Sequence, residues 1–147
     1  MITQLDMLED DLYVLFALRE MIRKAQELGA NKGVAAISVC KMGQPNGAIH
    51  FLAVNEKIER VSNGRPDDVG TNYLGVVMAK IAIMMATGVP SGTYVHSVKR
   101  GEVPFKGGLI GEYSLFKVYV AFSGLSEDDD VIVASVGLKA MLPEILK

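Results

Sequence analysis

A run of thirteen residues from Leu74 to Ala86 carries a single charged side chain, Lys80. A helix of this length is too short to cross a bilayer, which needs about 20 apolar residues, so we expect no membrane span. A helix that is apolar on every side is instead enclosed by protein. We therefore predict a helix over 73–86 that is either sandwiched between a sheet and the first helix or covered by a second subunit.

The first half of the chain before this helix has the pattern of one helix and two strands. Apolar residues recur at three- and four-residue steps from about Asp6 to Leu28, which predicts an amphipathic helix. The run from Val34 to Cys40 is almost wholly apolar and indicates a central strand covered on both faces. After a turn at Asn46-Gly47, the segment from Ala48 to Val54 indicates its hairpin partner.

The second half, after this helix, has the pattern of two strands followed by one helix. We expect strands at Leu109–Gly111 and Leu115–Ser123, the second half-buried because apolar residues alternate along it. Ser126 and Asp129 have the spacing of a capping box at the start of the last helix. Strands paired in hairpins between helices favour an α+β fold, an antiparallel sheet with helices on its faces.

Length and charge narrow the classes of protein. The chain has 147 residues, which predicts one domain over 1–147, and a net charge of −2, which argues against a nucleic-acid partner. One cysteine excludes an intramolecular disulfide, and with two histidines we expect no dedicated metal site. The first 30 residues lack the basic-then-apolar pattern of a signal peptide, so we expect a cytoplasmic protein.

Two residues are the main candidates for chemistry, and each has a plain structural alternative. Lys80 either holds an anionic group in a pocket or forms an ion pair with an acid such as Asp67 or Glu112. His50, between apolar residues of the second strand, either binds haem iron or acts as a base, or packs locally.

Three further features have weaker functional interpretations. His96 lies in a loop, where a histidine is typically solvated, and Cys40 is expected to be a buried thiol rather than a nucleophile. Gly107-Gly108 could cradle an anion with backbone amides or simply form a turn between strands.

Several local patterns resemble the haem-degrading or GlcG-like family, which includes HbpS-like and PduO C-terminal-like domains. The resemblance rests on Phe105-Lys106-Gly107-Gly108, on Val120 to Gly124 followed by acids at Asp128 to Asp130, and on Ala79-Lys80 followed by Gly88 to Ser91. It implies a profilin-like α/β/α sandwich and oligomers built from it. It also implies haem, a corrinoid-related molecule or a small organic acid as candidate ligands.

These observations together predict a homo-oligomeric protein that binds a small molecule, with no reaction assigned. We expect the pocket near Lys80, with Phe105, Gly107 and Gly108 beside it and His50 as a polar wall. The alternatives are an enzyme of small metabolites that uses Lys80 or His50 for proton transfer, or a purely structural interaction module.

Overall fold

The computed structural model describes residues 4–43, 47–62, 64–113 and 115–141, with the backbone alone for residues 4–11. The expected turn at Asn46-Gly47 lies partly outside these residues. The helices are α1 (Gln4–Glu27), α2 (Tyr73–Thr87) and α3 (Glu127–Met141), with short 3-10 helices η1 (Val54–Glu56) and η2 (Val95–Ser97). The strands are β1 (Val34–Lys41), β2 (Ile49–Ala53), β3 (Gly108–Tyr113) and β4 (Phe116–Ser123).

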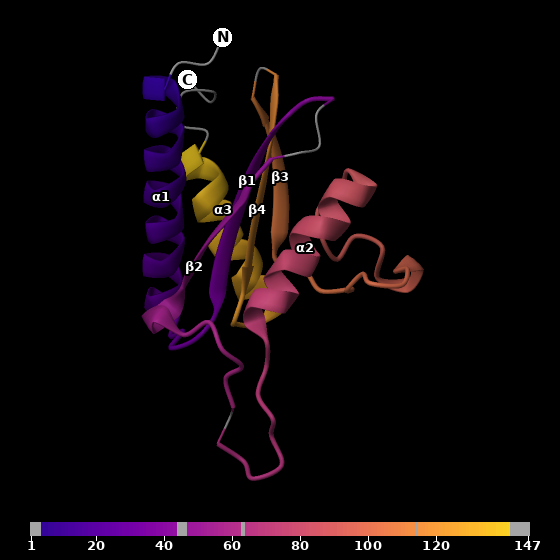
Figure 1. The fold of residues 1–147 in the computed structure, drawn as a ribbon. Helices are drawn as coiled ribbons and strands as arrows, with labels where there is room; N and C mark the ends of the chain where they lie inside the picture. The colour runs from indigo at the N-terminus through magenta and orange to yellow at the C-terminus, as the bar shows by residue number, and fades with distance from the viewer. Residues whose placement is uncertain (1–3, 44–46, 63, 114, 142–147) are drawn as a thin grey trace.

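The described strands form one antiparallel sheet in the order β2-β1-β4-β3. Helices α1 and α3 cover one face of this sheet and α2 covers the other, which confirms the predicted α+β fold and α/β/α layering (Figure 1). Alternate residues of β1 divide between the two layers, since Ile37 packs with α1 and α3 whereas Ala36 packs with α2. No helix among the described residues is long and apolar enough to pass through a bilayer.

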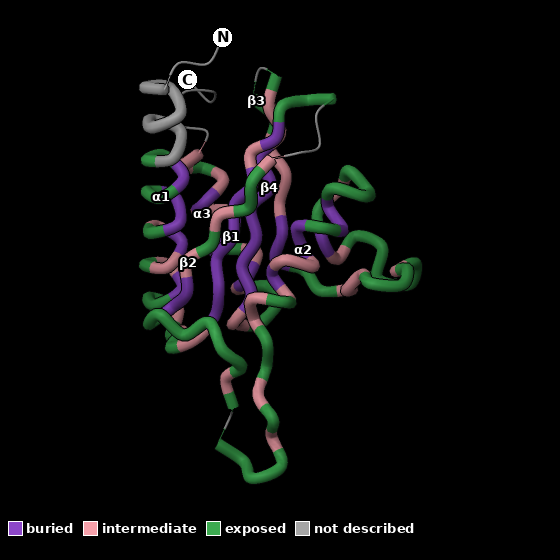
Figure 2. The backbone as a smooth tube through the Cα atoms, in the orientation of Figure 1, coloured by how far each residue is buried: buried purple, intermediate pink, exposed green. Residues whose placement is uncertain are grey.

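Burial is concentrated in the two central strands (Figure 2). The prediction of a strand covered on both faces is confirmed for β1. It was wrong for β4, which was expected to be half-buried, because α2 also covers the face that carries Tyr119 and Ala121. The edge strand β2 keeps Ile49 and Phe51 exposed, because they lie on the α2 face of the sheet and α2 packs mainly against the other three strands.

Helix α2 is not enclosed in the first of the two ways that the sequence predicted, between the sheet and the first helix. Val77, Ile81 and Met84 pack on the sheet, but α1 lies on the opposite face and does not sandwich α2. The expectation that the first helix covers α2 was therefore wrong, because α1 packs against α3 instead. The side of α2 that faces away from the sheet exposes small and apolar residues: Gly75, Ala82, Met85 and Ala86.

Side chains and glycines fix the ends of α2 and α3. The Asn72 side chain accepts a hydrogen bond from the Gly75 amide at 2.8 Å, and Gly88 ends α2 in the left-handed region. At the start of α3, the Ser126 hydroxyl accepts from the Asp129 amide at 3.2 Å, which is the first of the two bonds of the predicted capping box. These contacts fix where both helices begin and where α2 ends.

Candidate functional site

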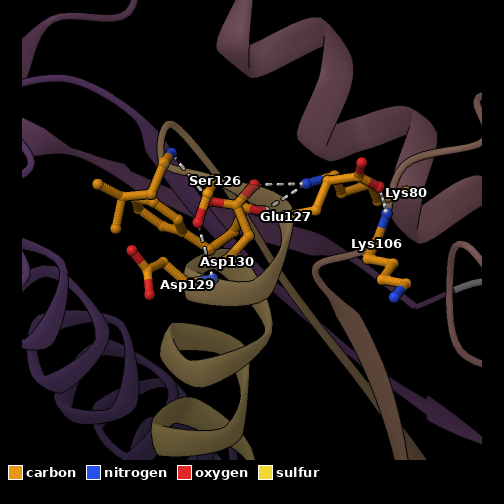
Figure 3. Close-up of polar contacts among 8 residues, drawn as sticks. Lys80, Lys106, Ser126, Glu127, Asp129 and Asp130 are labelled. Atoms are coloured by element: carbon orange, nitrogen blue, oxygen red, sulfur yellow. Dashed lines mark hydrogen bonds and ion pairs between the residues drawn. The ribbon is translucent and has the colours of Figure 1, made fainter.

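A buried ion pair joins the two helical layers. The ammonium of Lys80, on α2, donates to the carbonyl oxygen of Phe122 at 2.7 Å and to Oδ2 of Asp130, on α3, at 3.1 Å (Figure 3). Lys80 is 1% exposed and Asp130 is 3% exposed. The other carboxylate oxygen of Asp130 accepts from the Leu125 amide at 2.9 Å. Because α2 and α3 lie on opposite faces, the lysine side chain crosses the level of the sheet.

Burial disfavours the charged form of both groups in this pair. It lowers the pKa of Lys80 below its ordinary value, an effect that the Asp130 carboxylate opposes. It raises the pKa of Asp130, an effect that Lys80 and the Leu125 amide oppose. Each charged group therefore depends on the other, and removal of either one leaves an unpaired charge in the interior.

Two glycines at the start of β3 leave space for side chains, and the first of them, Gly107, borders the ion pair. Gly107 has a φ of +117°, and a Cβ there would lie 2.6 Å from Nζ of Lys80 and 2.8 Å from the Phe122 carbonyl oxygen. A Cβ on Gly108 would lie 2.7 Å from the Met84 side chain. Gly107 thus permits close packing around Lys80, and Gly108 permits close packing against Met84. Gly107 also accepts a hydrogen bond from the Phe122 amide through its carbonyl oxygen.

These contacts identify the acid that pairs with Lys80. The partner is Asp130 and not Asp67 or Glu112, the two acids suggested from the sequence. Glu112 lies in β3, and its Oε1 is 3.8 Å from Nζ of Lys117 on β4. Both acceptors of the Lys80 ammonium come from the protein itself, which accounts for its burial without a ligand. Of the other residues expected beside it, Gly107 and Gly108 are in place, and Phe105 is 43% exposed in the preceding loop. Ligand binding by this group stays a prediction.

His50 lies in a different part of the molecule. It sits in β2 opposite Ile37, and β2 is separated from β3 by the two central strands. The structure therefore does not bring His50 to the wall of the Lys80 group. His96 is exposed in η2, and Cys40 is buried at 6% exposure, as the sequence indicated.

His50 instead lines a cleft between α1 and β2. The cleft has a volume of about 310 Å³ and is open on its outer side. His50 is its only titratable side chain among the described residues, and it is half-buried. The lining residues are Val14, Leu15, Leu18, Ile49, His50 and Phe51.

Sequence reasoning missed this cleft because its walls come from two segments more than 30 residues apart in the chain. The helical period predicted an amphipathic helix from about Asp6 to Leu28, and His50 was found within its strand. The signal that the period did not use is the alternation within β2, which places the side chain of His50 on the face of the sheet opposite to Ile49 and Phe51. Only the packing of α1 beneath β2 turns these residues into one site.

Three solved structures share this fold. The Klebsiella pneumoniae protein ORFY, a DUF336-family protein, has a TM-score of 0.57 at 16% identity, over 91% of this chain and 88% of that chain. The PduOC:heme complex has a TM-score of 0.57 at 13% identity, over 90% and 91%. The Ybr137w protein has a TM-score of 0.56 at 17% identity, over 88% and 77%. No family model matches the sequence, and no curated protein matches it by sequence.

Proposed function

We propose that the chain is a GlcG-like (DUF336) protein that binds a flat, largely apolar small molecule in the cleft between α1 and β2. The observation that carries this proposal is the cleft itself, with one imidazole set among apolar walls. Its fold neighbours support the same class of function, since one of them is a complex with haem. Ligand sites of this kind are typically apolar concavities with few polar groups that fix orientation.

Haem is the member of this ligand class that the side chains fit best. A neutral imidazole is a common axial ligand of haem iron, and His50 is half-buried beside Leu15, which could contact the macrocycle. When bound, haem would supply redox or gas-binding chemistry. The cleft volume of about 310 Å³ lies at the low end for ligand sites, so one chain would cover only part of a molecule of this size.

We also propose that the protein is a homo-oligomer in which a second copy covers the outer side of α2. Along the fifteen residues of this helix the only charged side chain is Lys80, and it points inward. The outward positions Gly75, Ala82 and Ala86 are small and exposed, which permits close approach of another helix. An exposed helix face without charges is unusual unless a partner covers it.

Titration with haemin tests the ligand. We expect saturable binding and a shifted Soret band for the wild-type chain. His50→Ala should weaken binding by roughly tenfold or more, about 1.4 kcal/mol, and abolish the shift because the iron loses its axial ligand. His96→Ala is the matched control, since this histidine is exposed in η2, and it should titrate like the wild type. Equal binding by His50→Ala and the wild type would refute the proposed site.

Light scattering tests the assembly. The wild-type mass should be a multiple of 15.9 kDa. Ala82→Lys places a charge at the centre of the outer side of α2 and should lower that mass, whereas Gln26→Lys, at an exposed position of α1, should leave it unchanged. A wild-type mass of one chain contradicts the proposed assembly, and an unchanged mass in Ala82→Lys contradicts the proposed surface.

A further inference from the structure

Helix α1 carries one basic side chain that no acid neutralises. Of its three basic residues, Arg23 pairs with Glu20 at 2.9 Å and Lys24 pairs with Glu27 at 3.4 Å. Arg19 is exposed, and none of the ion pairs or hydrogen bonds among the described residues involves it. No acid stands three or four residues away from it on either side, so the helix itself offers Arg19 no partner.

Arg19 stands at the rim of the cleft that His50 lines. Leu15 and Leu18 are lining residues of this cleft, and Arg19 follows Leu18 directly and lies about one helical turn after Leu15. Side chains of an α-helix lean toward its N-terminus, so the side chain of Arg19 extends over the turn that carries Leu15. Its guanidinium can therefore reach a molecule in the cleft while it stays in water.

The interior of the cleft is apolar, and the positive charge lies at its rim. Apart from His50, every lining residue is a valine, leucine, isoleucine or phenylalanine. A carboxylate enclosed among these side chains would lose its hydration without gaining a permanent cation, which is unfavourable. At the open side it keeps contact with water and lies within reach of Arg19. A ligand with an apolar body and an acidic edge therefore fits with its body inward and its acid outward.

We propose that Arg19 is a specificity-determining residue of this cleft, which selects a flat apolar molecule that carries a carboxylate at one edge. A guanidinium presents parallel N–H donors that match the two oxygens of a carboxylate. Among the described residues of α1 it is the one cation without an acid, so it matches a single negative charge better than the near-dianion of a phosphate monoester.

This inference rests on the proposed function, because it assigns the chemistry of the ligand to the cleft already proposed. It also moves the anion-binding role away from Lys80, the cation for which the sequence suggested it. Both acceptors of the Lys80 ammonium belong to the protein, Phe122 and Asp130, whereas the Arg19 guanidinium keeps its donors for a ligand.

Haemin and its dimethyl ester test this preference, because they share the iron and the macrocycle and differ in the two carboxylates. At low salt, the wild-type chain should bind haemin roughly fivefold more tightly than the ester, the range of an exposed ion pair. Arg19→Gln should bind haemin roughly fivefold more weakly than the wild type and the ester with unchanged affinity. Because exposed charges are screened by salt, the wild-type preference should shrink as the ionic strength rises.

Arg23→Gln is the matched control. It removes the same charge from the same helix, about one turn further from the cleft, where Arg23 already pairs with Glu20. This variant should keep the wild-type preference for haemin over the ester. Circular dichroism should be native for both variants, since both positions are exposed.

The outcomes separate this inference from the proposed function. If the wild type binds haemin and the ester equally, or Arg19→Gln keeps the wild-type preference, the inference is overturned. An equal loss in Arg23→Gln also overturns it, because the general charge of α1 would then explain the preference. In all three cases, binding that His50→Ala weakens leaves the proposed site standing. If His50→Ala binds haemin as tightly as the wild type, the proposed site fails and the inference fails with it.

Discussion

The ammonium of Lys80 and the carboxylate of Asp130 meet at 3.1 Å although 50 residues separate them in the chain and their helices cover opposite faces of the sheet. The contact passes the start of β3, where Gly107 has no side chain to obstruct it. Asp130 is also bonded to the Leu125 amide, and Lys80 to the Phe122 carbonyl. This one interaction therefore connects α2, β4 and α3.

We predict that the ion pair behaves as a unit in a double-mutant cycle. Lys80→Met or Asp130→Leu alone should lower the free energy of unfolding by about 3–5 kcal/mol, because each leaves the other charge buried and unpaired. The double variant should lose much less than the sum of the two. Urea unfolding at neutral pH measures all four proteins. The surface pair Glu20–Arg23, in which Arg23 is exposed and Glu20 partly exposed, serves as the control cycle, with a coupling of at most about 1 kcal/mol.

We predict that Gly107→Ala is more harmful than Gly101→Ala. Both glycines have positive φ, +117° and +87°, so alanine pays a backbone penalty of about 1–2 kcal/mol at each position. At Gly101 nothing lies within 4 Å of the added Cβ, whereas at Gly107 it meets Lys80, Asp130 and Phe122. Thermal unfolding of the two variants compares them directly. Equal losses of stability would show that the contact with the ion pair has no energetic weight.

We predict that Tyr119 makes the protein less stable at alkaline pH. Burial raises the pKa of Tyr119 above its ordinary value of 10.0, with smaller contributions from Cys40 and Glu112. Above pH 10.0 the unfolded chain releases the phenolic proton while the folded chain still holds it, so stability falls as the pH rises through the folded pKa.

Urea midpoints at about pH 9 and about pH 11 measure this effect. Tyr119→Phe should lose less stability over that interval than the wild type, whereas Tyr113→Phe, at an exposed position, should follow the wild type. Equal losses of stability for the wild type and Tyr119→Phe over this interval would mean that the Tyr119 hydroxyl has the same pKa in the folded and unfolded states.

We predict that the start of α2 depends on the side chain of Asn72. Asn72→Ala removes the acceptor of the Gly75 amide and should cost about 1 kcal/mol. Asn72→Asp keeps an acceptor at the same position and should retain most of the stability. The difference between the two variants in thermal midpoint isolates the cap, and a midpoint for Asn72→Ala equal to that of the wild type contradicts it.

The order of elements could be predicted from local patterns, but the contacts between them could not. The apolar run of 74–86 correctly predicted a helix packed on the sheet, and the capping residues placed the start of α3. The alternation along β4 predicted a half-buried strand, which was wrong, because α2 covers the second face and its position depends on tertiary packing rather than on local periodicity. For the same reason the sequence indicated that Lys80 needs a partner but did not identify Asp130.

The candidate site shows the same limit. His50 was singled out from its type and its strand, whereas the helical wall of its cleft depends on how α1 crosses β2. The exposure of Ile49 and Phe51 likewise follows from their place on an edge strand beyond the reach of α2, which the hairpin pattern does not specify.

The path of the Lys80 side chain past Gly107 has a consequence for local unfolding. If α2 separated from the sheet on its own, the Asp130 carboxylate would remain buried without its partner. Unfolding of α3 alone would leave the Lys80 ammonium buried and unpaired in the same way. The middle of α2 and the first turn of α3 should therefore open together, as a single cooperative foldon that spans both faces of the sheet.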